Sequence, residues 1–302
     1  MKRYARFCIL AIFAAYLVAL RFCAEFAGCM LARVSVPGMA LLHRLTAPIP
    51  FPVAEPLALA LAVGLVVGAA RAPSRRRAPR ACLNVLLALV AAFAVLWGPA
   101  IAIPAGQLPA PGADALAGLC EALIDELNAA PLSFPGPADA LARAPDVAGL
   151  PGCAVKAARY PEWMALAGAW GAFVPLTGEA LADPDAPPPL VPFTAVHELM
   201  HLTGIANEGA ANIAAWEKCM AAGGPFADSA RLWALRYAMG LLRSESPASW
   251  QSARNKMEGA LLRTFLCCGG EAEAPSPRLS ITCGDYAALA GYLADESWGR
   301  FC

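Results

Sequence analysis

Three apolar stretches in the first 103 residues constrain the fold of this chain more than any other feature. They cover about residues 7–24, 53–70 and 81–103, and each approaches the roughly 20 residues that an α-helix needs to cross the hydrocarbon core of a bilayer. Arg21 interrupts the first stretch, but a long arginine side chain can reach back to the membrane surface. We therefore predict that residues 1–103 form a membrane anchor with three transmembrane helices.

A cleaved signal peptide is the alternative explanation for the first stretch, because such peptides also begin with basic residues. However, no small-residue cleavage site stands out after the apolar run, and two further apolar stretches follow it. These observations favour an uncleaved first helix.

The composition agrees with a membrane anchor. Of the 302 residues, 59% are hydrophobic and only 15% are charged, which is too apolar for an ordinary cytosolic enzyme. Residues 1–103 contain 11 Lys or Arg and two acidic residues, whereas residues 104–302 contain 12 Lys or Arg and 21 acidic residues. A basic apolar part followed by an acidic polar part indicates a membrane protein with a water-facing domain. A lipid bilayer is therefore an expected partner, and a nucleic acid is not.

A short arginine-rich loop predicts how the chain crosses the membrane. Residues 71–80 contain five arginines and no acid, and they separate the second apolar stretch from the third. Short basic loops beside transmembrane helices usually lie in the cytoplasm, which explains this loop better than nucleic-acid binding does. Three crossings then place residues 104–302 outside the cytoplasm. We expect a multi-pass protein of the cytoplasmic membrane with an extracytoplasmic C-terminal domain.

Residues 104–302 are predicted to be rich in α-helix, with at most a small sheet before residue 192. A linker rich in Pro and Gly, residues 104–113, leads out of the membrane. Apolar residues at helical spacing, together with Pro and Gly residues that end helices, place the helices of this part. The predicted helices cover about residues 114–130, 160–173, 192–204, 207–223, 232–242, 246–268 and 285–295.

Glu179 and the cysteines of this part carry weaker expectations. Glu179 stands in a passage that contains Pro and Gly, and we expect an exposed loop carboxylate there, with a role in the catalytic cleft as the alternative. The seven cysteines after residue 103 show no Cys-x-x-Cys spacing, so they predict no second metal site. Disulfides and unpaired core thiols are equally compatible with these cysteines.

The His-Glu-x-x-His motif at residues 197–201 indicates a catalytic or metal-binding site. His197 and His201 are two of only three histidines, and on a helix they project from the same face, four residues apart. This spacing lets two imidazoles bind one metal ion, and it is typical of catalytic zinc sites. Glu198 follows His197 and is rotated by about 100° around the helix, so it can address a water molecule instead of binding the metal. The apolar neighbours of the motif indicate a buried helix, which makes a chance match a poorer explanation.

Two further residues complete the predicted site. A catalytic zinc ion usually has three protein ligands, and with His43 as the remaining histidine the third ligand is predicted to be a carboxylate. Glu208 is the best candidate, because it begins the next helix just after a turn at Gly204. Asn212 lies one helical turn further, where its side-chain oxygen could accept the free ring N–H of a ligating histidine. A first-turn acid and a solvated polar residue are the alternative explanations for these two residues.

These residues resemble two known groups of proteins. The His-Glu-x-x-His motif is shared by the zincin metallopeptidases, and the branch with a glutamate ligand often has Glu-x-x-Ala-Asp, which Glu208-Gly-Ala-Ala-Asn212 resembles. The chain is also similar to a bacterial membrane family named domain of unknown function 3810, which usually has an acid where this chain has Ala210. The segments that carry this second resemblance are Pro-Phe-Pro-x-x-Glu at 50–55, Trp-Gly at 97–98, Pro-Leu-Thr-Gly-Glu-Ala at 175–180 and the histidine motif.

The resemblance implies a zincin-like fold for residues 104–302. Together with the motif it predicts a membrane-anchored, zinc-dependent metallopeptidase that cleaves a peptide or protein substrate. His197, His201 and Glu208 would hold Zn²⁺, and Glu198 would be the general base. Tyr237 and Arg231 could stabilise the oxyanion, although each is also an ordinary residue of an amphipathic helix.

The sequence is also compatible with two alternative functions. The first is a non-catalytic membrane protein with a structural metal site, for which Cys219 is a conceivable fourth ligand. The second is an intramembrane zinc protease, which the prolines at 187–189 and the lack of a later apolar span argue against.

Overall fold

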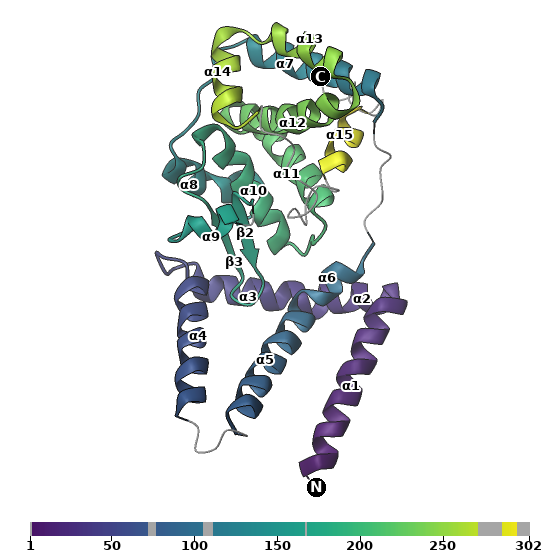
Figure 1. Cartoon of the computed structure of the whole chain (residues 1–302), viewed down its shortest axis with the longest axis vertical. Coiled ribbons are helices and arrows are strands. Elements are labelled where there is room, and N and C mark those ends of the chain that lie inside the picture. Colours follow the sequence, from purple (N-terminus) through teal and green to yellow (C-terminus); the bar gives the residue numbers. More distant parts are fainter. Residues whose placement is uncertain (1, 72–76, 105–110, 167, 271–285, 295–302) are drawn as a thin grey trace. The chain divides into compact units, whose positions relative to one another are not determined.

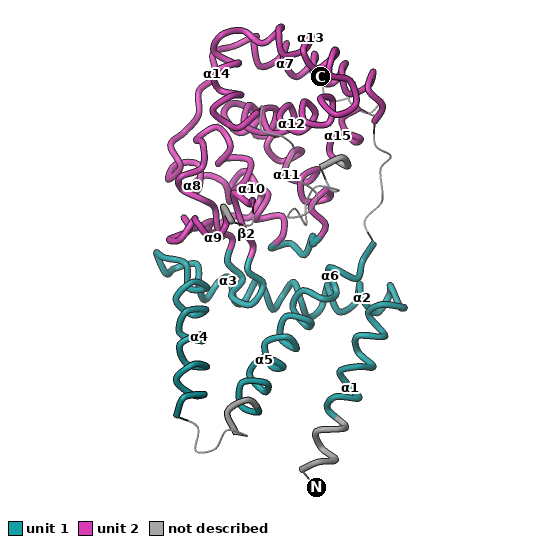
Figure 2. The backbone as a smooth tube through the Cα atoms, viewed as in Figure 1, with its two compact units in different colours: residues 1–104, 174–179, 202–206 teal, residues 105–173, 180–201, 207–302 magenta. Residues whose placement is uncertain are grey.

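The computed structural model describes residues 2–71, 77–104, 111–166, 168–270 and 286–294. The chain divides into two compact units (Figure 2). Unit 1 comprises residues 1–104, 174–179 and 202–206, and unit 2 comprises residues 105–173, 180–201 and 207–302. Much of the predicted arginine-rich loop (72–76) and of the predicted linker (105–110) lies outside the described residues.

Unit 1 consists of the N-terminal helices and two short segments from later in the chain, residues 174–179 and 202–206 (Figure 1). Its helices are α1 (Lys2–Phe22), α2 (Ala24–Met30), the π-helix η1 (Leu31–Ser35), α3 (Val36–Thr46), α4 (Ala54–Ala70), α5 (Arg77–Leu96) and α6 (Gly98–Ala102). Helices α1, α4 and α5 overlap the three predicted apolar segments. The predicted third segment is not one helix, because α5 ends at Leu96 and Pro99, near the start of α6, cannot continue the hydrogen-bonding ladder of a preceding helix.

The candidate membrane span differs from the prediction. Among the described residues, the helix that is both long and apolar enough to cross a membrane is the continuous segment Ala24–Thr46, which α2, η1 and α3 form together. The apolar helices at Ile9–Phe22, Ala54–Ala70 and Arg80–Leu96 are shorter. The predicted helices did not include Ala24–Thr46. Three transmembrane helices therefore stay a prediction.

Glu179 is not the exposed loop residue that we expected. Its side chain is only 1% exposed, and its carboxylate accepts hydrogen bonds from the backbone N–H groups of Val53, at 2.8 Å, and Ala54, at 2.7 Å. These two groups belong to the beginning of α4, where backbone donors have no partner within the helix. The prediction was wrong because this partner lies about 125 residues earlier in the chain.

Unit 2 is mainly helical and contains a small sheet, as predicted. Its helices are α7 (Ala113–Asn128), α8 (Pro137–Ala148), α9 (Pro161–Leu166), the 3₁₀ helix η2 (Pro188–Leu190), α10 (Val191–Leu202), α11 (Glu208–Ala222), α12 (Gly224–Glu245), α13 (Pro247–Lys256), α14 (Gly259–Cys267) and α15 (Tyr286–Ala294). Helix α12 packs against α7, α11, α13 and α15 and forms the centre of this arrangement (Figure 1). The predicted helix over residues 114–130 corresponds to α7, whose buried face consists of Leu116, Leu119, Cys120, Leu123, Ile124 and Leu127.

The sheet has three strands, β1 (Val155–Ala157), β2 (Gly171–Val174) and β3 (Glu179–Ala182), in the order β1-β3-β2. Strands β1 and β3 are parallel, with Val155 opposite Ala180. The predicted aromatic helix over residues 160–173 is therefore wrong beyond Leu166. The chain leaves the helix before Gly168, whose positive φ of 69° is a left-handed conformation that glycine adopts readily, and residues 171–174 then form the edge strand β2.

Three cysteines of unit 2 are buried thiols and not disulfides: Cys120, Cys219 and Cys268. Burial raises the pKa of Cys120 and of Cys268 to about 12, so both thiols stay protonated at neutral pH. Cys283 and Cys302 lie outside the described residues.

Candidate metal centre

Helix α10 places the two histidines of the motif. All twelve of its residues are buried. The helix carries apolar side chains such as Val196, Leu199 and Met200 on several sides, and these side chains pack into the core. His197 and His201 have side chains that are 9% and 6% exposed. Their rings lie edge to face, with centroids 4.7 Å apart, as residues four positions apart on one helix face require.

Helix α11 supplies the carboxylate. The chain turns at Gly204, whose φ of 96° suits glycine, and α11 then begins at Glu208. Asn207 caps the helix, and its Oδ1 accepts the backbone N–H of Ala210 at 2.8 Å. The cap at Asn207 therefore fixes the backbone immediately beside Glu208.

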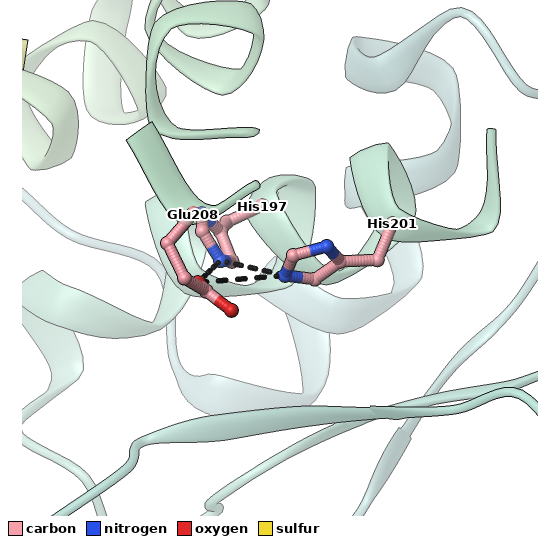
Figure 3. Close-up of side chains that lie close together, drawn as sticks. All are labelled: His197, His201 and Glu208. Carbon is pink, nitrogen blue, oxygen red and sulfur yellow. Dashed lines mark hydrogen bonds and ion pairs between the residues drawn. The ribbon is translucent and has the colours of Figure 1, made fainter. Parts of the chain in front are cut away.

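Three side-chain atoms converge at this point. Nε2 of His197 lies 3.0 Å from Oε2 of Glu208 and 3.1 Å from Nε2 of His201, and Nε2 of His201 lies 3.6 Å from the same Oε2. Figure 3 shows the two imidazoles and the carboxylate pointing toward one another. Among the described residues, His197, His201 and Glu208 are the group whose ligand atoms could hold one metal ion.

The donor geometry fits zinc. In a tetrahedral site with bonds of about 2.0–2.1 Å, two ligand atoms lie roughly 3.3 Å apart, and the three observed separations scatter around that length. Two imidazole nitrogens and one carboxylate oxygen are also a donor set that catalytic zinc sites use, with the fourth position left for water. The residues present therefore fit a zinc ion with three protein ligands.

The electrostatics of Glu208 also suit a ligand. Burial by itself raises the pKa of this carboxyl, but hydrogen bonds and charge interactions with His197 and His201 outweigh that effect and hold the pKa well below its usual range. The group is therefore an anion at neutral pH, which is the form that binds a cation.

Glu198 occupies a different environment. It is 5% exposed, and burial raises the pKa of its carboxyl, although the nearby His197 and His201 oppose this effect. The backbone of Gly171 on β2 lies directly against it: a Cβ at Gly171 would overlap Oε1 of Glu198 and lie only 2.8 Å from Cγ and Cδ. A carboxylate with a raised pKa beside two imidazoles is the arrangement expected of a general base.

Asn212 is buried on α11, but its side-chain oxygen does not accept a hydrogen bond from the ring of His197. It is 2% exposed, and both its Nδ2 and the Nδ1 of His197 lack a hydrogen-bond partner among the described residues. The structure therefore gives no hydrogen bond through which Asn212 would orient the ring of His197.

The other residues that the sequence suggested lie outside the cluster. Arg231 forms ion pairs with Glu126 and with Asp228, the latter at 3.2 Å. The ring of Tyr237 stacks on Trp233 with centroids 5.2 Å apart. Cys219 is buried on α11, but it is not among the described residues whose ligand atoms could share the metal ion.

Sequence reasoning missed two aromatic neighbours and one glycine. Phe193 lies against His197 and Phe173 stacks on His201, each with ring centroids 6.4 Å apart. Phe193 precedes His197 by one helical turn, so the spacing could have indicated this contact. Phe173 and Gly171 come from β2, which the sequence analysis had assigned to a helix.

The chain was compared with known protein families, curated proteins and solved structures. Residues 37–265 match the model of a family described as "Protein of unknown function (DUF3810)". The chain belongs to this family. The DUF3810 match covers α10, α11 and β2, which contain His197, His201, Glu208 and Gly171. It confirms the resemblance to domain of unknown function 3810, and the resemblance to the zincin metallopeptidases stays a prediction. No curated protein and no solved structure matches the chain.

Proposed function

We propose that this DUF3810 protein is a membrane-anchored zinc metallopeptidase. The observation that carries the proposal is the convergence of His197, His201 and Glu208 around one point, with a second acid, Glu198, that the ligand set does not use. A structural metal site needs no such additional buried acid, whereas a hydrolase needs a base beside its water.

The chain's own residues account for the proton transfers. A zinc ion held by the three ligands would supply a Lewis acid that lowers the pKa of a bound water to about 7. Glu198 takes a proton from the attacking water as that water adds to the scissile carbonyl. The same carboxyl then gives the proton to the leaving amine, so one peptide bond and one water become a carboxylic acid and an amine.

The membrane anchor is the second part of the proposal. Helices α1, α4 and α5 contain 21, 17 and 20 residues, which corresponds to roughly 26–32 Å of helix and is comparable with the hydrocarbon core of a bilayer. Their large apolar side chains are widely exposed, for example Ile12 at 70%, Leu59 at 62% and Leu86 at 56%. Exposed apolar surface of this extent is typical of contact with lipid. With the arginine-rich loop in the cytoplasm, the metal centre would lie outside the cytoplasm.

The substitution Glu198→Gln tests the chemistry. Glutamine keeps the shape of the side chain but cannot take a proton, so we expect cleavage of a mixed peptide library to fall by about 10²- to 10⁴-fold while zinc content is unchanged. The readout is product formation by mass spectrometry beside metal analysis of the same sample. Glu162→Gln, which changes an exposed acid on α9, is the matched control and should behave like wild type. Undiminished cleavage by the Glu198→Gln protein would overturn the mechanism.

A further inference from the structure

The helix Ala24–Thr46 has a different direction from the other long helices of unit 1. In Figure 1 it runs across the ends of α1, α4 and α5, which lie roughly along one common direction. Its segments contact these neighbours: α2 contacts α1, and η1 and α3 contact α5. A helix at this angle cannot cross the same bilayer that α1, α4 and α5 cross.

One face of this helix is polar and is covered by protein. Nδ1–H of His43 donates to the carbonyl of Gly178 at 2.7 Å, Oγ1 of Thr46 donates to the carbonyl of Thr177 at 3.3 Å, and Oγ of Ser35 donates to the carbonyl of Val95 at 2.8 Å. The residues that share this buried face, at intervals of three or four, are Ser35, Met39, His43 and Thr46.

The turn at Gly178 fits closely against this face. Its φ is 67°, and a Cβ there would come within 2.6 Å of backbone atoms of both Met39 and His43. This contact belongs to unit 1, because residues 174–179 are part of it. The face is thus closed to any other partner.

The opposite face is apolar and exposed. Val34, Leu41 and Leu45 are 38%, 58% and 65% exposed, and at 100° per residue they lie within about 40° of one another on the helix. Arg33 and Arg44 are also exposed and lie together along one edge of this stripe. An apolar stripe bordered by basic side chains is the pattern of a helix that lies in a membrane interface.

The ionisable residues argue against a transmembrane orientation of the same helix. Glu25, Arg33, His43 and Arg44 lie within its 23 residues. Charged groups in the middle of a bilayer cost several kcal/mol each unless they are paired inside the protein. In the interface, Arg33 and Arg44 can instead meet lipid phosphates while the apolar stripe enters the outer edge of the hydrocarbon.

We propose that Ala24–Thr46 lies flat in the membrane interface, with Val34, Leu41 and Leu45 in the lipid and its polar face against the protein. The helix contacts α1 and α5, whose apolar side chains are exposed like those of α4, and this makes the same bilayer its partner. The inference rests on the membrane anchor of the proposed function and is independent of the peptidase chemistry.

Immersion depths of spin labels test this orientation. The full-length protein is placed in vesicles of phosphatidylcholine with some phosphatidylglycerol. It carries p-acetylphenylalanine at the position of Val34 or of Leu45, and a nitroxide is coupled to this residue. This labelling chemistry leaves the native cysteines in place. Depth is read from the relative accessibility of the label to oxygen and to a water-soluble nickel chelate. Eleven residues of transmembrane helix would separate the two depths by about 16 Å, whereas a flat helix places both labels roughly 5–10 Å below the surface.

Two reference positions make the outcomes distinguishable. Leu86 on α5 should be deep in the lipid, and Trp163, which is 73% exposed on α9, should be in water. Equal shallow depths at Val34 and Leu45 support the flat orientation. Depths that differ by about 16 Å, or labels at both positions as accessible to nickel as Trp163, overturn it. If Leu86 is also in water, the membrane anchor of the proposed function fails as well.

Discussion

Gly171 is the residue at which a single added carbon would most directly disturb the site. Its backbone lies against the carboxylate of Glu198, and a Cβ would be 2.8 Å from Cγ and Cδ of that side chain. The substitution Gly171→Ala should displace Glu198 without changing His197, His201 or Glu208, the proposed zinc ligands. Because displacements of about 1 Å in an active site cost up to about 10²-fold in rate, we expect kcat to fall by about 10- to 100-fold with zinc content unchanged. Steady-state cleavage and metal analysis check both expectations.

Gly118→Ala is the matched control for this prediction. Gly118 lies on α7, and a Cβ there would meet no atom within 4 Å. Alanine should leave cleavage unchanged and raise stability slightly, because alanine favours helix more than glycine does by about 1 kcal/mol. Wild-type turnover of the Gly171→Ala protein would contradict the position assigned to Glu198.

At the residue scale, the sequence predicts the parts of the site that are close in the chain. His197, Glu198 and His201 follow from the period of a helix, and Glu208 follows from a glycine turn and a capped second helix. The structure brings His197, His201 and Glu208 together as expected. Gly171 and Phe173 could not be found this way, because the residue pattern of their short strand does not distinguish it from the helix predicted over residues 160–173.

At the scale of elements, Glu179 links the start of β3 to the start of α4. Its carboxylate accepts hydrogen bonds from Val53 and Ala54, and a negative charge at a helix N-terminus is also favoured by the helix dipole. Glu179→Gln removes the charge and leaves only one oxygen to accept. We expect a loss of about 1–3 kcal/mol of unfolding free energy, measured by denaturant unfolding of the detergent-solubilised protein.

Glu162→Gln serves as the control here too, because Glu162 is exposed on α9 and its loss should change stability by less than about 0.5 kcal/mol. An equal effect of both substitutions would mean that Glu179 does not stabilise the start of α4.

Other elements illustrate what local signals can and cannot do. The two helices of the candidate metal centre were predicted to within a few residues, because Pro and Gly residues mark their ends. The single helix predicted over residues 246–268 is instead two helices, α13 and α14, with a break at Met257 and Glu258, whose backbones are extended. Neither residue type ends a helix by itself, and the local signal for this break is Gly259, with which α14 begins.

At the scale of the whole molecule, the division into an apolar part and a polar part was visible in the charge distribution. The burial of one face of the helix Ala24–Thr46 was not, because His43 and Thr46 on that face bond to a turn that comes more than a hundred residues later in the chain. Hydropathy alone cannot reveal such a face, which depends on contacts distant in sequence. The lateral orientation of this helix therefore became apparent only from the structure (Figure 1).

The central claim is that this chain holds one zinc ion through two histidines and a glutamate. The chain has only three histidines and therefore offers a matched pair of variants. The substitution His197→Ala removes a proposed ligand, whereas His43→Asn changes the histidine outside the cluster. Nδ1 of His43 donates to the carbonyl of Gly178, and the side-chain amide of asparagine can donate the same hydrogen bond. The histidine variants thus separate loss of the site from loss of a structural contact.

Metal analysis of the purified full-length protein, beside these two variants, tests the claim most directly. The account predicts about one zinc per chain in wild type and in the His43→Asn protein, and little or none in the His197→Ala protein. A wild-type protein that binds no zinc when zinc is supplied, or a His197→Ala protein that keeps a full equivalent, would contradict it.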